Sequence, residues 1–506
     1  MDKNELNFNS DKELLDWLIT THENYYIELK KAQELPNAFW ESYSAFANTS
    51  GGVIVLGVEE HEDENVILGV NNPQKTLADL WAQLSNTNKV SFKCINNEDV
   101  VPYKFGEKTV IIVYVHEAPN SQKPVYLNGK LEQTFIRTGD GDRKATKDEL
   151  GSFLRNAQPI QDDIVIDLLS LDDLDKQSVV SFKERVSLKY PNKKYDDMTI
   201  EQFLIEIGGA KKNRKTGKLE IKKGTLLFLG KVNAIKEFLP HYHVDYFNRR
   251  GNNERWVDRV TDDEPNEFEM NLYNFYNIVF NKMTALLLES FELDDSITRE
   301  PVSGYEEPLR ECLVNCLAHA DYEKGYPSIK IEAFEGWFRF VNPGQMLISV
   351  GQFFIGGDSR PRNEVLMKYF RYLGASERQG FGGPLIIKAA VRNSYRRPEI
   401  VTDIEHTEVK IWNMDIVDSH PELTEVEKTV YRYIRKNGSS ESLRDMARKL
   451  SLSEYKVRNA INTLVNEKKM LRKIGNARNT RYVIDADNID LITQLQLVVD
   501  AMRRRI

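Results

Sequence analysis

Residues 23–30 read ENYYIELK, and residues 48–60 read NTSGGVIVLGVEE. Alternating side chains predict a strand in the first stretch, and an apolar run after two glycines predicts a buried strand in the second. Glu23 and Glu28 lie in the first stretch, and Glu59 lies where the second strand ends. The question raised by these two strands is whether the three carboxylates form one site or are separate solvated charges.

The faces of the two strands follow from the alternation of side chains. Glu28 and Lys30 share one face, and Glu59 is expected on the face of Val53 and Val55. Carboxylates near a lysine can hold Mg²⁺ or Mn²⁺, which activates water or stabilises a phosphate leaving group. Acidic residues at strand ends are also commonly solvated, so spacing alone leaves both interpretations open.

The whole chain has the composition of folded domains. It has 506 residues, of which 41% are hydrophobic, 29% charged and 10% aromatic. This length favours about three or four domains. The N-terminus has no basic segment followed by an apolar core, and no run approaches the roughly 18 apolar residues of a membrane span. Three cysteines favour a reducing compartment over a disulfide framework. We expect a cytoplasmic, multi-domain protein of mixed α/β (α+β) class with no membrane contact.

The charge is unevenly distributed along the chain. Residues 421–484 contain 15 Lys and Arg against 7 Asp and Glu, a balance of +8, while the whole chain carries −8. The remainder therefore carries −16. A basic module in an acidic chain often contacts nucleic acid.

Hydrophobic periodicity predicts the order of elements. We expect helices over residues 1–20, 36–50, 145–157 and 273–291, and strands in the stretches VIVLGV, VSFKCI, TVIIVYVHEA, QTFIRTGDGDRKAT, KGTLLFLGK and HYHVDYFNRR. The expected domains are residues 1–158, an intermediate α/β region at 159–300, an α/β unit at 301–415, a helical module at 421–484 and a tail helix at 485–506.

The N-terminal pattern resembles the Schlafen-type AlbA_2 domain. The matching residues are Glu23, Glu28-Leu29-Lys30, Asn48-Thr49-Ser50-Gly51-Gly52 and Gly57-Val58-Glu59-Glu60. The similarity covers roughly residues 15–155, with its specific part in the first 60. The resemblance implies that Glu23, Glu28 and Glu59 are the metal ligands and catalytic acids of a ribonuclease that cuts transfer RNA, with Lys30 beside them. Here the third acid is Glu where Asp is common, and many bacterial members have no demonstrated nuclease activity.

A second polar group lies in EPLRECLVNCLAHADY, which begins at Glu307. On a helix, Glu311, Asn315 and His319 fall one turn apart and share a face. Such a stripe is also typical of a solvated helix face. A carboxylate one turn before an amide can equally activate water while the amide binds the Mg²⁺ of a nucleotide.

This segment resembles the N-box of GHKL-type ATPases in a divergent form, and the similarity extends over about residues 300–415. The resemblance implies an α/β sandwich that binds ATP, with Glu311 activating water and Asn315 as a Mg²⁺ ligand. Its implied cofactor-binding residues are Glu311, Asn315, His319, Asn342, Gly344, Gly380, Gly382 and Gly383, the last three forming a flexible phosphate loop. Asn342-Pro343-Gly344 stands where typical members have an Asp that reads adenine, which weakens the case for ATP.

Histidine and cysteine spacing gives little support for zinc. Cys312, Cys316 and His319 lack a nearby fourth ligand, so we expect the two thiols to be buried core groups. His241 and His243 alternate onto one strand face, which is weak evidence for a metal site.

The segment 421–484 predicts three helices followed by a strand, a turn and a second strand, the order of a winged helix-turn-helix. Tyr455 and the polar residues of the third helix and the wing are expected to contact bases or phosphates: Lys456, Arg458, Asn459, Asn462, Lys473, Arg478 and Arg481. Winged helices also serve as protein-docking modules, and the charge favours nucleic acid. Leu491, Leu495 and Val498 of the tail are candidates for pairing with a second subunit.

Two functions compete at this stage. The first is a metal-dependent endonuclease acting on RNA, tRNA or single-stranded DNA, gated by nucleotide and used in antiviral (phage) defence. The second is an ATP-responsive DNA-binding transcriptional regulator with a non-catalytic AlbA_2 domain. The matched acids favour the first, and the basic winged helix favours the second.

Overall fold

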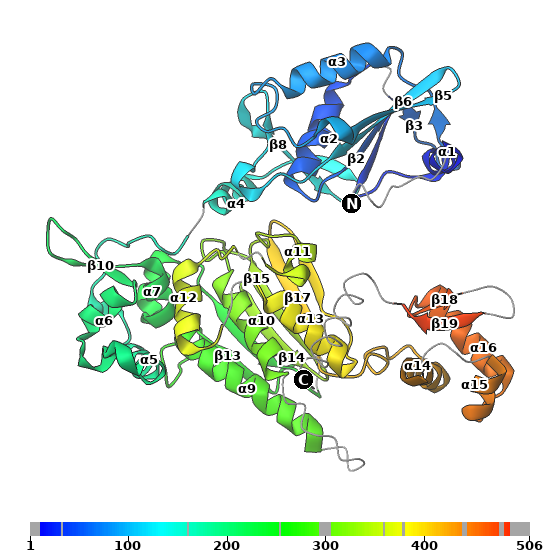
Figure 1. Ribbon diagram of the computed structural model, residues 1–506. Coiled ribbons are helices and arrows are strands. Elements are labelled where there is room, and N and C mark those ends of the chain that lie inside the picture. The colour runs from blue at the N-terminus through cyan, green and yellow to red at the C-terminus, as the bar shows by residue number, and fades with distance from the viewer. Residues whose placement is uncertain are drawn as a thin grey trace. The chain divides into compact units, whose positions relative to one another are not determined.

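A computed structural model describes residues 11–31, 34–158, 161–251, 255–292, 305–357, 360–376, 380–437, 443–474 and 480–485 (Figure 1). The chain divides into two compact units, Met1–Gln161 and Asp162–Ile506. Over these described ranges, no helix has both the length and the apolar character needed to cross a bilayer. The fold is mixed α/β in both units, which confirms the expected class.

The first unit is built on a four-stranded sheet. Its elements are α1 (Asp11–Thr20), β1 (Ile27–Lys30), α2 (Asn37–Asn48), β2 (Gly52–Leu56), β3 (Val58–Glu59), β4 (Val66–Ile67), α3 (Pro73–Leu84), β5 (Val100–Phe105), β6 (Lys108–Val115), β7 (Tyr126–Leu127), β8 (Lys130–Thr138), β9 (Gly141–Lys144) and α4 (Lys147–Ala157). The sheet order is β1-β2-β6-β5, with β1 parallel to β2 and the other pairs antiparallel.

Both faces of this sheet are covered, which explains the apolar run of β2. Phe39 and Phe46 of α2 pack with Ile54 on one face. Leu14 of α1 packs with Val53 on the other. A strand buried on both sides reads as a continuous hydrophobic run. The expected strand VSFKCI is wrong, because only Val90 makes a bridge there, to Leu127.

Gly57 changes which side chain follows the strand. It has φ +98, a conformation that favours glycine. The turn breaks the alternation of β2, so Val58 joins Val53 and Val55 in their cluster. The prediction that Glu59 shares the face of these valines is therefore wrong.

The second unit contains a six-stranded sheet of order β13-β12-β14-β15-β17-β16. Its elements up to the sheet's last strand are α5 (Lys176–Lys189), α6 (Ile200–Glu206), β10 (Ala210–Lys212), β11 (Leu219–Ile221), α7 (Lys223–Leu229), α8 (Val232–Phe238), β12 (Val244–Asn248), β13 (Asp258–Thr261), α9 (Leu272–Glu292), α10 (Glu306–Ala318), β14 (Ile329–Phe334), β15 (Trp337–Pro343), α11 (Val350–Ile355), α12 (Glu364–Leu373), α13 (Gly382–Asn393), β16 (Glu399–Thr402) and β17 (His406–Trp412). Strand β12 is parallel to β14, and the other neighbours are antiparallel.

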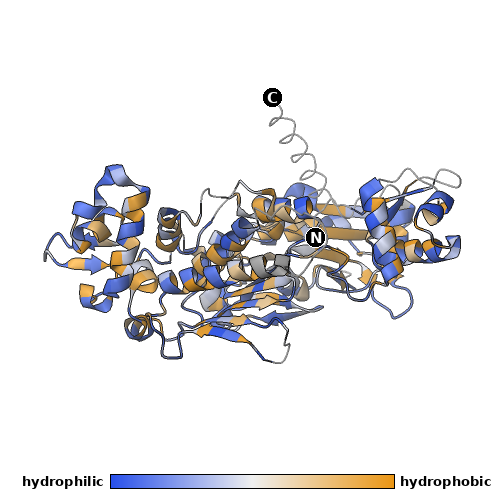
Figure 2. Cartoon of the chain, turned by 90° about the horizontal axis from the view of Figure 1, so that it is seen from below, coloured by the Kyte–Doolittle hydropathy of each residue, from blue (hydrophilic) through white to orange (hydrophobic). Residues whose placement is uncertain are grey.

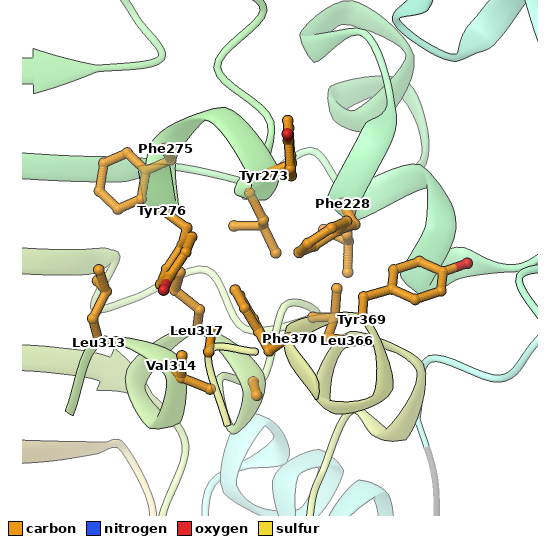
Figure 3. Close-up of a cluster of buried hydrophobic side chains, with 14 of the residues drawn as sticks. Phe228, Tyr273, Phe275, Tyr276, Leu313, Val314, Leu317, Leu366, Tyr369 and Phe370 are labelled. Atoms are coloured by element: carbon orange, nitrogen blue, oxygen red, sulfur yellow. The ribbon is translucent and has the colours of Figure 1, made fainter. Parts of the chain in front are cut away.

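The expected regions 159–300 and 301–415 share this sheet and one hydrophobic core. Figure 3 shows the centre of that core, where Phe228 and Tyr276 come from the first region and Phe370 from the second. The ring centroids of Phe228 and Phe370 are 5.3 Å apart, and those of Tyr276 and Phe370 are 5.2 Å apart. Residue 300 therefore does not separate two cores.

The stretch KGTLLFLGK forms helix α7 rather than the expected strand. Every residue from Lys223 to Leu229 is buried. A short run buried on all sides carries no periodicity that distinguishes a strand from a helix, so the sequence prediction failed here. The long helix expected at 273–291 is present as α9, and HYHVDYFNRR contains β12.

The C-terminal segment has its own small core. It contains α14 (Glu425–Asn437), α15 (Leu443–Lys449), α16 (Glu454–Asn462), β18 (Leu471–Ile474) and β19 (Arg481–Ile484), the last two paired antiparallel. Val430, Val457 and Leu464 are among its buried residues. Figure 2 shows apolar and polar residues alternating along the helices, as amphipathic packing requires. Arg478 and the tail residues Leu491, Leu495 and Val498 lie outside the described ranges.

Candidate functional site

Glu28 is buried on β1 and is bound by two cations. Ile27 and Leu29 face the cluster under α1, so Glu28 faces the side covered by α2. Its Oε2 lies 2.5 Å from Nη1 of Arg137, and its Oε1 accepts from Lys30. Glu28 is 6% exposed. The carboxylate expected to bind a metal is therefore the acceptor of a buried ion pair.

Arg137, at the end of β8, organises this network. Its side chain is fully buried, and Nη1 also lies 2.9 Å from Oδ1 of Asp142. Nη2 donates to the backbone oxygens of Asn24 and Ile27 at 2.7 and 3.1 Å. Burial opposes the charge, but Asp142 and Glu28 outweigh it and raise the pKa of Arg137 above its ordinary value. A buried guanidinium of this kind depends on both carboxylates.

Glu23 lies close to Glu28 and to a third acid that is not Glu59. Oε1 of Glu23 accepts from the backbone N–H of Leu29 at 3.0 Å, and its own N–H donates to Oε1 of Glu60 at 2.8 Å. Burial, and then the charges of Glu28 and Glu60, raise the pKa of Glu23. The acidic group at this end of the sheet is therefore Glu23, Glu28 and Glu60. The second acid of the pair after Gly57 was not singled out from the sequence.

Glu59 is held by other partners. Its Oε1 lies 2.6 Å from Nζ of Lys31, and its Oε2 lies 3.9 Å from Nε2 of His61. The hydrogen bond from Lys31 lowers the pKa of Glu59.

The donor set expected from the sequence does not fit a metal in this geometry. Within the described residues, His243, Asp262 and Asp263 have possible ligand atoms that all lie within 4.8 Å of one another. Glu23, Glu28 and Glu59 do not form such a group. Both oxygens of Glu28 and one oxygen of Glu59 are occupied by cationic side chains. No catalytic step through a metal follows from this arrangement.

The His243 cluster is an ion-pair network on β12 and the turn after β13. Nε2 of His243 lies 2.7 Å from Oδ2 of Asp245, and Nδ1 lies 2.8 Å from Oδ1 of Asp262. Lys236 lies 2.7 Å from Asp262 and 2.9 Å from Asp263. Asp245 and Asp262 raise the pKa of His243 to about 10. The ring is therefore an imidazolium at neutral pH, and both of its nitrogens are donors, which does not suit a metal ligand.

A pocket opens on α10 in the second unit, with about 1020 Å³ of empty space including the part open to solvent. Glu311, Asn315 and His319 all line it, as the shared helix face predicts. Its other polar lining side chains are Asn342, Gln345, Arg360, Arg371, Ser376 and Thr407. The apolar wall includes Phe340, Leu347 and Ile386.

Glu311 is the best-positioned acid in this pocket. Nδ2 of Asn315 donates to its Oε1 at 3.0 Å. Burial raises the pKa of Glu311, and burial together with Arg362 lowers the pKa of His319 to about 4. His319 is therefore neutral at physiological pH. Cys312 and Cys316 are buried, and burial raises the pKa of both thiols, as expected for core groups.

The glycines of the pocket allow neighbouring groups to approach the backbone closely. Gly382 and Gly383 lie in the first turn of α13 rather than in the flexible loop that we expected. A Cβ on Gly382 would lie 2.0 Å from Oε1 of Glu311. Gly380 has φ +77 and lines the pocket, whereas Gly344 is outside the lining and bonds to Glu405 and Thr407.

Two arginines of the pocket were missed by the sequence reasoning. Arg360 lines it from the segment before α12, and Arg371 lines it from the last turn of that helix. Nε of Arg371 is buried and has no hydrogen-bond partner among the residues that the structure describes. An orphaned guanidinium nitrogen beside an acid–amide pair fits the phosphates and metal of a nucleotide. The pattern R-x-R-x₈-R in residues 360–371 was the available signal.

On α16, the expected nucleic-acid contacts are exposed. Lys456, Arg458, Asn459 and Asn462 face solvent, while Val457, Ala460 and Ile461 are buried. Lys473 and Arg481 are exposed on the hairpin β18–β19. In the described part of the chain, no ion pair joins Lys456 or Arg458 to an acid.

Comparisons with known proteins locate three domains. Residues 23–146 match the model described as "Schlafen, AlbA_2", and residues 327–411 match "Putative ATP-dependent DNA helicase recG C-terminal". Residues 151–245 match a domain of unknown function, DUF8451. No curated protein matches the chain.

Two solved structures are similar at low TM-scores. The DIP2311 protein from Corynebacterium diphtheriae is 15% identical over 96% of this chain and 97% of that chain, with TM-score 0.40. The N-terminal domain of a RecG-related putative ATP-dependent DNA helicase from Nitrosomonas europaea is 28% identical over 28% of this chain and 95% of that chain, with TM-score 0.21. At such TM-scores neither likeness bears on the fold or the function. The family matches confirm both resemblances: the chain is a multi-domain protein with a Schlafen-type AlbA_2 domain and a divergent ATPase-like domain.

Proposed function

We propose that this protein is a nucleotide-responsive nucleic-acid-binding regulator with a non-catalytic AlbA_2 domain. The observation that carries the proposal is the exposed face of α16, where Lys456 and Arg458 have no acidic partner among the described residues. Domains of the Schlafen AlbA_2 and RecG C-terminal types support a role connected with nucleic acid.

The C-terminal segment is well arranged for a winged helix-turn-helix. The buried side of α16 packs on α14 and α15, which leaves its polar side as the surface that enters a groove. Lys473 and Arg481 extend the positive charge onto the hairpin. Cations contact phosphates, while Asn459 and Asn462 are the types that read base edges.

The pocket on α10 supports nucleotide binding. Arg360 and Arg371 would hold the phosphates, and the amide oxygen of Asn315 would contact the metal that accompanies them. A bound Mg²⁺ or Mn²⁺ would neutralise phosphate charge. Burial raises the pKa of Glu311 above its ordinary value, although the hydrogen bond from Asn315 opposes that shift.

Binding to a labelled duplex tests the first part. We expect Lys456→Gln/Arg458→Gln to weaken the complex and to reduce the slope of log K against log salt by about 1.8, because each lost phosphate contact removes about 0.9. The control Lys176→Gln/Lys231→Gln removes two exposed cations elsewhere and should leave both quantities unchanged. Equal loss in the two variants would reject α16 as the contact.

Nucleotide binding is tested separately with ATP and Mg²⁺ by calorimetry. Arg371→Gln should abolish the heat of binding and leave the unfolding temperature unchanged, because Nε has no hydrogen-bond partner in the described part of the chain. Duplex affinity should also depend on ATP in the unmodified protein and not in this variant. An ATP-independent affinity would reject the regulatory coupling.

A metal-dependent endonuclease used in antiviral defence is the second candidate. The observation that favours it is the gathering of Glu23, Glu28 and Glu60, where burial, and then the charges of the other two acids, raise the pKa of Glu23. Incubation with tRNA and single-stranded DNA, with Mn²⁺ and with EDTA, decides between the two. Metal-dependent products that disappear in Glu28→Gln and in Glu60→Gln, but persist in Glu59→Gln, would establish the nuclease with the acids that the structure brings together. Intact substrates in every lane would support the regulator instead of the nuclease.

A further inference from the structure

The hairpin β10–β11 is the most strongly basic segment of the second unit outside the C-terminal module. Residues 210–223 read AKKNRKTGKLEIKK, with seven Lys and Arg and a single Glu. The segment lies within the domain of unknown function. Figure 1 shows the hairpin projecting away from α6 and α7.

The hairpin has a defined shape. Ala210 pairs with Ile221 and Lys212 pairs with Leu219, and Ala210 and Ile221 are buried in the core. Asn213 organises the turn: its Oδ1 accepts from the N–H groups of residues 215 and 216 at 2.9 and 3.0 Å. Side chains on this turn therefore project from an anchored support.

Partners within the protein account for only some of its cations. Lys211 lies 3.5 Å from Glu220, Lys223 lies 2.9 Å from Glu323, and Lys222 pairs with Asp163. Four exposed cations remain, and none is joined to an acid in the part of the chain that the structure describes: Lys212, Arg214, Lys215 and Lys218.

A further lysine lies at the base of the hairpin. Nζ of Lys368, on α12, lies close to Gly208: a Cβ added to Gly208 would be 2.9 Å from that Nζ. Burial, and then the charges of Lys222 and Arg371, lower the pKa of Lys368. Cationic side chains of α12 therefore lie close to Lys222 at the base of the hairpin.

We infer that these four exposed cations of the hairpin bind the phosphate backbone of nucleic acid, as a contact separate from α16. The inference rests on the proposed function and adds a surface to it. Lys and Arg on a rigid turn contact phosphates without reading bases, and a two-stranded ribbon fits the major groove of a duplex. The turn Asn213–Lys218 contains no aromatic or aliphatic residue that could insert into a bilayer, so nucleic acid fits better than an anionic membrane.

Duplex binding by the full chain tests this contact. The hairpin variant is Lys212→Gln/Arg214→Gln/Lys215→Gln/Lys218→Gln. Its control, Lys104→Gln/Lys130→Gln/Lys176→Gln/Lys231→Gln, removes the same charge from scattered exposed positions. We expect the hairpin variant to bind a duplex of about 24 base pairs at least about tenfold more weakly at low salt, with a salt slope reduced by about 2 to 4. The control should change neither, and thermal unfolding should be the same in both.

The outcomes separate this inference from the proposed function. If the unmodified protein binds no duplex, the proposed function and the hairpin contact are both rejected. If it binds and the α16 variant weakens binding while the hairpin variant matches its control, only the hairpin contact falls. Vesicles of phosphatidylcholine with about one-third phosphatidylserine are the second probe. Loss of vesicle binding with unchanged duplex binding in the hairpin variant would overturn the inference in favour of a membrane surface.

Discussion

Gly383→Ala is the substitution for which the structure gives the clearest magnitude. A Cβ at this position would lie 1.9 Å from the carbonyl oxygen of Phe353 and 2.6 Å from its carbon. Ordinary contact begins near 3.4 Å, so α11 and α13 must separate by about 1.5 Å. Because both obstructing atoms belong to the backbone, rotation of a side chain cannot relieve the overlap.

The expected loss follows from two opposing effects. Overpacking costs up to about 3 kcal/mol, and replacing glycine by alanine in a helix returns about 1 kcal/mol. We expect Gly383→Ala to lose about 2 kcal/mol of unfolding free energy. The matched control is Gly351→Ala in α11, where no atom of the described residues lies within 4 Å of the added Cβ. This control should gain about 1 kcal/mol, a difference of about 3 kcal/mol between two neighbouring helices.

Urea unfolding of the full chain, followed by circular dichroism, measures both variants against the unmodified protein. The slope against urea should stay constant, so that the midpoint shift reports stability. Equal or greater stability of Gly383→Ala would show that α11 and α13 do not approach as closely as the structure has them. The arrangement of α11 and α13 along the wall of the pocket on α10 would then be different from the one described.

Three further predictions concern the sites. The three atoms nearest to a Cβ at Gly382 all belong to the side chain of Glu311. Gly382→Ala should therefore leave stability within about 1 kcal/mol and weaken ATP binding at least about tenfold, as titration calorimetry would show. Unchanged affinity would contradict the placement of Glu311. Arg137→Met leaves Glu28 and Asp142 without their shared cation and should lower the free energy of unfolding in urea by about 3–5 kcal/mol. Its control, Lys31→Gln at the exposed pair with Glu59, should lower it by less than about 1 kcal/mol. Similar losses in the two variants would refute the buried network. The pKa of His243 is raised to about 10 from the ordinary 6.5, so the stability that its charge contributes is fully present below pH 6.5 and is lost as pH rises towards 10. The melting temperature of the unmodified protein should therefore fall over this range, and His243→Gln should remove that fall. The same pH profile in both proteins would refute the prediction.

Long periodic elements were predictable from the sequence. The helices α2, α9 and α10 and the shared pocket face of Glu311, Asn315 and His319 follow from helical spacing. The two strands β1 and β2 also follow from alternation and apolar runs. Local patterns of this kind depend on neighbours in the chain, which the sequence displays directly.

Features that depend on tertiary contacts were not predictable. The partner of Glu28 is Arg137, 109 positions away along the chain. The left-handed turn at Gly57 moved Glu59 off the expected face. Helix α7 is buried on every side, and β12 joins β14 across the expected boundary at residue 300. In each case the deciding contact comes from a distant segment or from one backbone angle that no spacing rule reveals.

Photo-crosslinking of a labelled duplex to the full chain tests the central claim, nucleic-acid binding without cleavage, most directly. Peptides that carry the label after digestion are identified by mass spectrometry. We predict intact nucleic acid in the presence of Mg²⁺, with crosslinks in α16 (Glu454–Asn462) and in the hairpin β10–β11. Crosslinks confined to the neighbourhood of Glu23 and Glu28, accompanied by metal-dependent cleavage, would contradict it.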